Sequence, residues 1–351
     1  MPDFKVELLE PSDVRWLDAL SRIPHDIYML PEWCRVHESM DGGSAKAILV
    51  QSSDDILLIP VIQRQLSAGL WDATSPYGYA GYLSSRSDDR FLNDALRAVR
   101  LQIGVEGCVS LFLRLHPVLN QQQVSEADAT VTHGPTVIVN LEQSHGEWWQ
   151  SVRKSHRYEI SRAQRAGMII RTTQDVSDFN TFAGLYRETL ERLSASSYYL
   201  APTTYFYDLL TKFEGKIQLW VAEVDKTIVA GSMFALAESA QIAQYMYSAT
   251  ATEFRSLQPS KAILAAFIQH ALRARSAAVL HLGGGVGAGR DGLLDFKMGF
   301  SGSTLDFRSA RFVIRPEEFR SLTEYHLGKP SAQVFSDCSG FFPNYRQPKN
   351  S

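Results

Sequence analysis

Hydrophobic residues along the chain follow two repeats, one typical of helices and one typical of strands. They recur every three or four positions over 90–101 and 147–166, which predicts amphipathic helices. They alternate over 109–116 and form a short apolar run over 217–223, which predicts strands. Helices and short strands that succeed one another in this way indicate an α/β (α+β) protein. Further helices are expected at 14–20, 31–37, 176–193, 205–213 and 260–275, and further strands at 45–50, 56–64, 136–141, 168–172, 227–236, 241–247 and 278–282.

The order of these elements repeats. In each half, helices come first, followed by a strand hairpin, another strand, a helix and a final apolar strand. The repeat predicts duplication of one α/β unit, with domains at 1–145 and 146–330 and a tail at 331–351 that packs back on the fold.

The last apolar strand of the second half runs into a glycine-rich loop, residues 283–289. A compact segment follows, in which Lys297 lies between Phe296 and Phe300. Glycines permit close approach of a ligand to the backbone, and ligands often bind at such loops. A lysine between two aromatic residues is either a surface residue or a positioned charge.

The context of this loop argues against two nucleotide-binding motifs. Gly283, Gly285 and Ala288 match the G-x-G-x-x-A dinucleotide fingerprint, but Gly292 and Gly299 leave room for only about two helical turns. No Gly-Lys-Ser/Thr follows, so the loop is not a P-loop. A ligand-binding loop and a flexible connection both remain open.

The helix expected at 147–166 is strongly basic. Only Glu159 opposes five cations between positions 153 and 165. The whole chain carries 35 basic and 38 acidic residues, a net charge of −3, so this is its most concentrated positive patch. Phosphates are natural partners of such a patch, although many basic helix faces are simply solvated. The expected buried stripe is Trp149, Val152, His156, Ile160 and Ala163, and the cations are Arg153, Lys154, Arg157, Arg162 and Arg165.

The first half offers a second candidate binding region. The loop at 74–82 carries three tyrosines, whose rings suit either ligand contact or packing on the core. Arg114 and His116 share one face of a strand and form either an anion site or a structural salt bridge. Arg64 ends an apolar run, where it either points into a cleft or lies in solvent.

Composition narrows the class of protein. The 351 residues, 45% hydrophobic and 21% charged, predict a globular protein of about two domains. Cys34, Cys108 and Cys338 lie far apart without metal-ligand spacing, so we expect reduced thiols and no metal site. Because no apolar run reaches transmembrane length and the N-terminus lacks the apolar core of a signal peptide, we expect a cytoplasmic protein without stable membrane insertion. The acidic balance disfavours DNA as a partner.

Several segments resemble the FemABX-type (FemA/FemB-like) aminoacyltransferase branch of the GNAT acyltransferase superfamily. The most specific likeness is the Phe-Lys-x-Gly-Phe pattern within Asp291–Phe300, preceded by Leu282-Gly-Gly-Gly285. The likeness covers nearly the whole chain. The other similar segments are Lys154–Gly167, which resembles the family's basic helix, Ser75–Tyr79, Arg114–Pro117 and Phe341–Arg346.

The resemblance implies two tandem GNAT-like domains, each a mixed, mostly antiparallel sheet flanked by helices, with a cleft between them and acyl transfer in the second. Members of the branch move an aminoacyl group from aminoacyl-tRNA to an amine of a peptidoglycan precursor or a small metabolite. The motif lysine lies beside the reacting centre in the family, which implies a catalytic role for Lys297. Its ammonium would stabilise the tetrahedral oxyanion or the leaving ribose oxygen. An aminoacyl ester is already activated, so positioning could supply much of the rate.

The same interpretation assigns roles to further residues. Tyr247 is expected to be catalytic or to line the acyl site. Gly283, Gly284, Gly285, Ser260, Phe296 and Phe300 are expected to bind the acyl donor; Arg153, Lys154, Arg157, Arg162 and Arg255 are expected to bind phosphate or tRNA; Tyr77, Tyr79, Arg64, Arg114 and His116 are expected to line the acceptor side.

The sequence departs from two patterns of the superfamily. The segment Arg255–Ala262, which corresponds to the CoA-binding loop, keeps an arginine but has no glycine, and Pro259 removes an amide donor. Acetyl-CoA is therefore disfavoured. The chain also lacks the coiled-coil insertion of many peptidoglycan members and a clear counterpart of their diphosphate-binding lysine, so a metabolite is a plausible acceptor.

Three hypotheses follow. The first is an aminoacyl-tRNA-dependent transferase, with aminoacyl-tRNA as co-substrate and no bound cofactor. The second is an acyl-CoA-dependent N-acyltransferase, in which the helix start at Ser260 binds pyrophosphate and Tyr247 is the general acid for the leaving thiolate. The third is a non-catalytic binding protein built on a GNAT-like scaffold.

Overall fold

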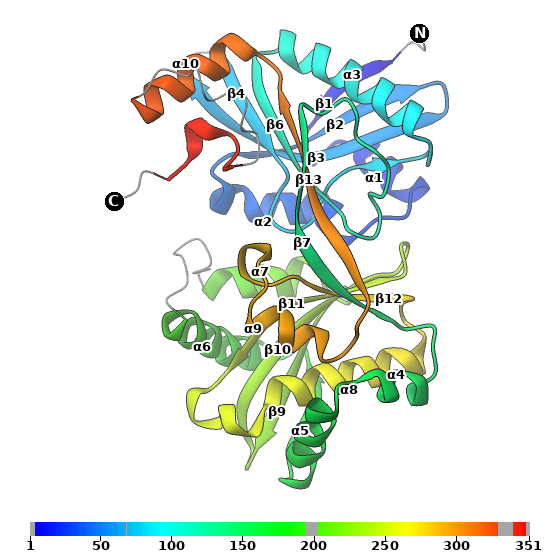
Figure 1. Ribbon diagram of the computed structural model, residues 1–351, viewed down its shortest axis with the longest axis vertical. Helices are drawn as coiled ribbons and strands as arrows, with labels where there is room; N and C mark the ends of the chain where they lie inside the picture. Colours follow the sequence, from blue (N-terminus) through cyan, green and yellow to red (C-terminus); the bar gives the residue numbers. More distant parts are fainter. Residues whose placement is uncertain (1–3, 68, 194–202, 329–339, 349–351) are drawn as a thin grey trace. The chain divides into compact units, whose positions relative to one another are not determined.

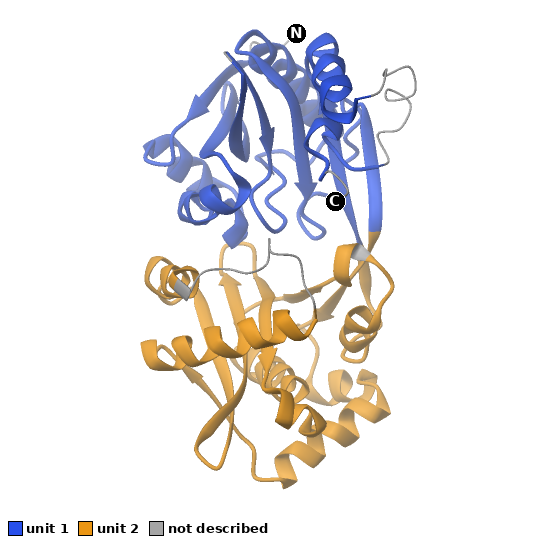
Figure 2. Cartoon of the chain, turned by 90° about the vertical axis from the view of Figure 1, so that its left-hand side faces the viewer, with its two compact units in different colours: residues 1–133, 306–351 blue, residues 134–305 orange. Residues whose placement is uncertain are grey.

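The chain forms two compact units, shown in different colours in Figure 2. The computed structural model describes residues 4–67, 69–193, 203–328 and 340–348. Unit 1 comprises residues 1–133 and 306–351, and unit 2 comprises residues 134–305. Each unit is a mixed, mostly antiparallel sheet flanked by helices (Figure 1), which confirms the predicted fold class.

The sheet of unit 1 is buried on both faces. On β2, Ile48 and Val50 pack with helix α3, whereas Ala47 and Leu49 pack on the other face with α1 and α2. This alternation follows from the two-residue repeat of a strand. In spatial order the strands are β1 (Lys5–Leu9), β2 (Ser44–Ser52), β3 (Asp55–Ser67), β4 (Leu70–Thr74), β6 (Cys108–Leu115) and β13 (Thr304–Val313), with β5 (Leu83–Ser84) beside β3; the helices are α1 (Val14–Arg22), α2 (Pro31–Asp41), α3 (Asp89–Val105) and α10 (Pro316–Leu327).

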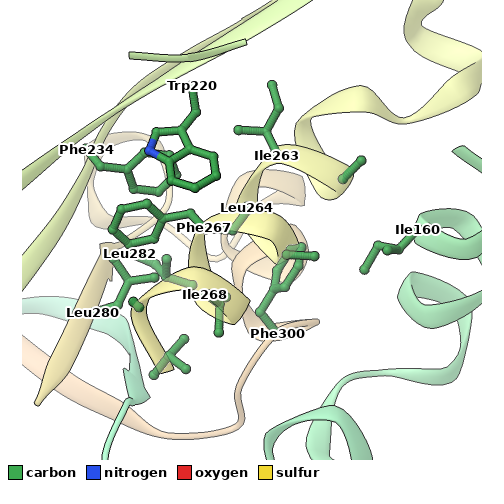
Figure 3. Packing of buried hydrophobic residues seen from close by; sticks show 14 of the residues in the cluster. Ile160, Trp220, Phe234, Ile263, Leu264, Phe267, Ile268, Leu280, Leu282 and Phe300 are labelled. Carbon is green, nitrogen blue, oxygen red and sulfur yellow. The ribbon is translucent and has the colours of Figure 1, made fainter. Parts of the chain in front are cut away.

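The core of unit 2 lies between its sheet and helix α8 (Figure 3). Phe267 of α8 stacks on Phe234 of the sheet, with ring centroids 3.8 Å apart. The strands are, in spatial order, β7 (Ala129–Asn140), β12 (Val279–Gly283), β11 (Ile242–Thr250), β10 (Thr227–Ala237), β9 (Ile217–Val224) and β8 (Ile169–Thr173); the helices are α4 (His145–Ser151), α5 (Lys154–Arg165), α6 (Val176–Arg192), α7 (Thr203–Lys212), α8 (Pro259–Ala274) and α9 (Gly292–Met298).

The predicted repeat is present, but its last strands are exchanged. In each unit, one strand and two helices precede three antiparallel strands, a helix and a strand parallel to its neighbour. The next strand in sequence after β6 is β7, which pairs with β12, and the next after β12 is β13, which pairs with β6. The compact units therefore differ from the expected domains at 1–145 and 146–330. The expected second domain included α10 and most of β13, which belong to unit 1, and the expected first domain included residues 134–145, which belong to unit 2.

One expected helix is two helices in the structure. The interpretation of 147–166 as a single helix is corrected by an extended Val152, which separates α4 from α5. The amide of Arg153 donates to the carbonyl of Gly299 at 2.9 Å, a bond that a continuous helix would not allow. The predicted end of the helix at Gly167 is confirmed, because this glycine follows α5 with a φ of +77°.

The described end of the chain packs within unit 1. The hydroxyl of Tyr345 hydrogen-bonds that of Ser110 at 2.7 Å, and Arg346 donates to the buried Asp72 at 2.6 Å. The rest of the expected tail, with Cys338, lies largely outside the described residues. Cys34 and Cys108 are buried and form no disulfide. No helix in the described part of the chain is both long enough and apolar enough to cross a membrane.

Candidate active site

Helix α9 carries Lys297 and begins at a carboxylate that also holds the glycine loop. One oxygen of Asp291 accepts the amide of Leu294 at 2.8 Å, which caps the helix. The other oxygen accepts the amide of Val286 at 2.8 Å. Asp291 therefore fixes the loop and the helix relative to one another.

The loop requires glycine at two positions. Gly283 has a φ of +74°, in the left-handed region that disfavours other residues. A Cβ on Gly285 would lie 2.2 Å from the carbonyl oxygen of Gly289, so the backbone leaves no room for a side chain there. At these two positions the conformation of the loop therefore requires glycine.

The ammonium of Lys297 is buried against this loop. The residue is 7% exposed, and its Nζ donates to the carbonyl of Gly284 at 2.6 Å. Burial lowers the pKa of Lys297 from 10.5 to about 8, against the opposing effect of Asp291. Lys297 is still mostly protonated at neutral pH. An ammonium has three N–H donors, so the others can serve a substrate oxygen.

The first turn of α5 binds the other end of α9. The guanidinium of Arg153 makes two bonds to Asp295, at 2.7 and 2.9 Å. Nε2 of His156 donates to the carbonyl of Phe296 at 3.0 Å, and a Cβ on Gly299 would lie 2.1 Å from that nitrogen. Burial lowers the pKa of His156 and favours its neutral ring. We expected Arg153 to meet phosphate, but its charge is matched by Asp295.

The glycine loop and Tyr247 lie at the same end of two parallel strands. β11 and β12 pair only over Ile242–Gln244 and Val279–His281. Gly284 and Tyr247 each come three residues after this pairing ends. Because the strands are parallel, both residues belong to the edge where the strands cease to pair. The structure therefore brings these two predicted elements to one region of unit 2.

A bulge in β11 turns Tyr247 away from its neighbour Tyr245. The register shifts by one residue between Tyr245 and Tyr247, which leaves Met246 unpaired. Tyr245 packs on Phe234 beside α8, whereas Tyr247 packs among rings of α6 and α7. The hydroxyl of Tyr247 hydrogen-bonds the hydroxyl of the buried Tyr205. Sequence reasoning missed Tyr205, whose only signal was its place in a helical repeat.

Ser260 belongs to a chain of hydroxyl groups. Its Oγ bonds Oγ1 of Thr250 at 2.7 Å and accepts from Ser248 at 3.3 Å. Ser248 in turn bonds Ser232 at 3.0 Å. Ser232 and Ser248 were not predicted, although they face each other across β10 and β11.

Two backbone amides near the start of α8 have internal partners. Pro259 has no amide hydrogen, and the amides of Lys261 and Ala262 both donate to the carbonyl of Gln258. In the preceding 3-10 helix (Thr252–Leu257), the first amide donates to a glutamate side chain. This geometry supplies few donors for a pyrophosphate.

The two aromatic residues that flank Lys297 differ in burial. Phe300 is fully buried in the core of unit 2, with its ring 5.0 Å from that of His156. Phe296 is only partly buried. Core packing therefore accounts for Phe300, and Phe296 is the flanking ring with exposed surface.

Most of the remaining cations of the basic helix are not paired with a carboxylate among the described residues. Glu159, the acid of α5, pairs with Lys261 at 2.5 Å, and Arg162 donates to the carbonyl of Ser256. Neither contact neutralises an arginine of α5. The other predicted phosphate-binding residues, Lys154, Arg157 and Arg255, have no carboxylate partner within residues 4–67, 69–193, 203–328 and 340–348.

Three of the predicted acceptor residues gather around one loop of unit 1. The ring of Tyr77 stacks on His37 with centroids 5.5 Å apart, and that of Tyr79 meets Phe307 at 5.1 Å. The guanidinium of Arg114 donates to a carbonyl of the same loop at 2.6 Å. All three are partly exposed, so they retain surface for a ligand.

The other two acceptor residues have internal partners. Arg64 donates to the buried Asp72 at 2.7 Å. His116 is 0% exposed; its Nδ1 accepts two backbone amides and its Nε2 donates to Asp26 at 2.9 Å. These contacts account for the ring of His116 and for Nε of Arg64, whereas the buried Nη2 of Arg64 has no hydrogen-bond partner among the described residues. No cluster of metal-ligating side chains occurs among the described residues.

The chain is similar to known proteins in the sequence of one segment and in its fold. Residues 150–297 match a family model described as an acetyltransferase (GNAT) domain. No curated protein sequence matches the chain. Among solved structures, FemX has a TM-score of 0.69 at 13% identity, over 90% of this chain and 99% of that one.

Two further solved structures are similar. L-PGS from Bacillus licheniformis has a TM-score of 0.55 at 12% identity, over 88% of this chain and 94% of that one. The C-terminal domain of a putative lysylphosphatidylglycerol synthetase from Agrobacterium fabrum has a TM-score of 0.54 at 14% identity, over 86% and 92%. At these identities the likeness concerns the fold.

The matched family segment contains the features described above. It begins in α4, includes α5, Tyr247 and the glycine loop, and ends at Lys297. The predicted resemblance is thus confirmed, both by the matched segment and by the shared fold. Residues 150–297 are thus similar to a GNAT acetyltransferase domain, and the chain as a whole has the fold of FemX.

Proposed function

We propose that the protein moves an aminoacyl group from aminoacyl-tRNA to an amine acceptor, either a small metabolite or a peptidoglycan precursor. In this reaction the amine nitrogen attacks the ester carbonyl and forms a C–N bond. The ester C–O bond breaks, and the ribose oxygen leaves with the proton lost by the amine. No oxidant, metal or bound cofactor is required by this chemistry.

The observation that carries the proposal is the buried ammonium of Lys297. It is fixed by Gly284 on one side and by a helix that is anchored at both ends. A positive charge held in a partly desolvated place stabilises an oxyanion or a leaving alkoxide without reorganising during the reaction. An activated ester needs no nucleophilic triad, so a positioned cation suffices.

The choice of donor rests on charge. Helix α5 lies in the same unit as Lys297 and keeps at least Lys154, Arg157 and Arg165 without carboxylate partners among the described residues. A polyanionic donor such as tRNA suits this surface. One similar structure is a domain of a putative lysylphosphatidylglycerol synthetase, and the lysyl group in that product is an aminoacyl group.

The second candidate is an acyl-CoA donor. It is favoured by the description of the matching family model, an acetyltransferase domain. Tyr247 would then protonate the leaving thiolate. The internally bonded amides at the start of α8 argue against it, because the pyrophosphate of CoA needs such donors. No feature of the site favours a non-catalytic binding protein.

The test is a transfer assay with both donors. Transfer RNA charged with labelled amino acids, or a set of acyl-CoA thioesters, is incubated with a panel of amines, and amide products are detected by mass spectrometry. We expect product from charged tRNA, lost in Lys297→Met and kept in Lys216→Met, a control at an exposed lysine. Product from acyl-CoA alone, or full turnover by Lys297→Met, would overturn the proposal. Thermal unfolding of both variants shows that they are folded.

A further inference from the structure

Helix α5 has an outer ridge directly opposite its buried stripe. His156, Ile160 and Ala163 are buried, and Ile160 points toward the core in Figure 3. At about 100° per residue, Lys154 and Arg165 fall almost opposite the centre of that stripe, with Tyr158 between them. All three residues of this outer ridge (Lys154, Tyr158 and Arg165) are exposed.

The ridge is cationic and contains no acid. The carboxylate of Glu159 forms an ion pair with the ammonium of Lys261 at 2.5 Å, so it does not neutralise the ridge. Asp295 is held by Arg153, which lies just before the helix. Among the residues that the structure describes, no carboxylate is within ion-pair distance of Lys154 or Arg165. The ridge therefore attracts anions.

Tyr158 distinguishes this ridge from a simple phosphate-binding surface. Its side chain is 61% exposed, although tyrosine normally buries much of its ring. Phosphates require only cations, whereas an exposed ring between cations suits a strand whose bases are free to stack. Bases within a duplex are already stacked on each other and do not offer their faces.

We infer that the outer ridge of α5 binds a single RNA strand, with an unpaired base stacked on Tyr158 and the adjoining phosphates on Lys154 and Arg165. The inference rests on the proposed function, because the 3′ end of a tRNA donor is single-stranded. From Lys154 to Arg165 the helix is about 16 Å long, which accommodates a few nucleotides.

Binding of a fluorescent RNA hairpin with a single-stranded 3′ end, compared with a blunt hairpin, tests the inference by anisotropy at several salt concentrations. Tyr158→Ala should weaken binding of the overhanging hairpin by about 5- to 100-fold, with the salt slope unchanged, and leave the blunt hairpin unaffected. Tyr158→Trp should retain binding. Lys154→Ala and Arg165→Ala should each reduce the salt slope by about 1 on the overhanging hairpin. Tyr325→Ala, at a 91% exposed tyrosine of α10, is the matched control.

Equal loss on both hairpins in Tyr158→Ala would overturn the inference, and so would no loss on either. Binding to phosphatidylglycerol vesicles that depends on Tyr158, in the absence of RNA binding, would instead assign the ridge to a membrane surface. The proposed function fails separately: Tyr158-dependent RNA binding without aminoacyl transfer supports the ridge and rejects the reaction, whereas transfer by Tyr158→Ala with an unchanged donor KM rejects the ridge alone.

Discussion

Arg153 and Asp295 form a two-bond ion pair although 142 residues separate them in sequence. The pair joins the start of α5 to the helix that carries Lys297, two residues beyond Asp295. Arg153 therefore belongs to the support of α9. The outer ridge of α5 is a different surface, so anchoring and donor binding are separable by mutation.

The first prediction concerns this pair. Arg153→Ala and Asp295→Ala should each lower kcat for aminoacyl transfer, by up to about 100-fold if α9 shifts by 1 Å. The kcat of the double variant should be no lower than that of the less active single variant, because both changes break the same contact. A donor phosphate site at Arg153 would instead raise the donor KM and reduce the salt slope of RNA binding in Arg153→Ala alone.

The second prediction follows from the pKa of Lys297, lowered by burial to about 8. Between pH 8 and 10.5 the unfolded chain holds a proton on this lysine that the folded chain has released. The free energy of unfolding of the wild type should therefore rise with pH across this window, by about 3 kcal/mol relative to Lys297→Met. Below pH 8 the difference should be constant. If the free energies of unfolding of the wild type and of Lys297→Met differed by the same amount at every pH, the result would contradict the buried position of the ammonium.

The third prediction is that activity depends on the same titration of Lys297. Activity should fall as pH rises, whereas stability should rise. If the protonated form of Lys297 stabilises the oxyanion, kcat/KM should fall as pH rises through about 8, because kcat/KM reports the pKa of the free enzyme. A pH–rate profile with subsaturating donor measures this. A base with that pKa would give the reverse profile, with activity that rises through pH 8, and would change the role assigned to Lys297.

The fourth prediction tests the contact between α5 and α9. A Cβ at Gly299 would meet the ring of His156 at 2.1 Å, so Gly299→Ala should destabilise the protein by about 1–3 kcal/mol. Gly302→Ala is the control, since nothing lies within 4 Å of a Cβ there. When His156→Ala is already present, adding Gly299→Ala should cost much less. An equal cost in both backgrounds would mean that the ring does not cause the restriction.

The last prediction concerns His116 of unit 1. His116→Ala removes a donor from the buried carboxylate of Asp26 and should lower stability by about 3 kcal/mol, measured by urea denaturation. Its effect on the acceptor KM should be small, because the ring is fully buried. Tyr79→Ala, at a partly exposed ring, should raise the acceptor KM instead. The reverse pattern would restore His116 as an acceptor ligand.

Local patterns predicted the elements that side-chain periodicity defines. The buried stripe of α5 was read correctly at His156, Ile160 and Ala163, because a helix brings every third or fourth residue to one face. The Phe-Lys-x-Gly-Phe pattern and its preceding glycines identified the Lys297 region, because their spacing is short and specific. Such features need only a few consecutive residues.

Contacts between distant segments could not be read in this way. The break at Val152 depends on Gly299, and His116 depends on Asp26, 90 residues away. Polar residues within β13, such as Arg308 and Arg311, obscured the alternation that would have marked it as a strand. These outcomes depend on which surfaces meet after folding.

The sequence by itself determined the α/β repeat, the helix and strand periods, the glycine loop and the lysine at its side. Only the tertiary structure decided that β7 and β13 are exchanged between the repeats, that Arg153 supports α9, and that Lys297 is buried. The physical reason is that periodicity is a property of neighbouring residues, whereas hydrogen-bond partners, desolvation and the resulting pKa depend on what the fold brings against each side chain.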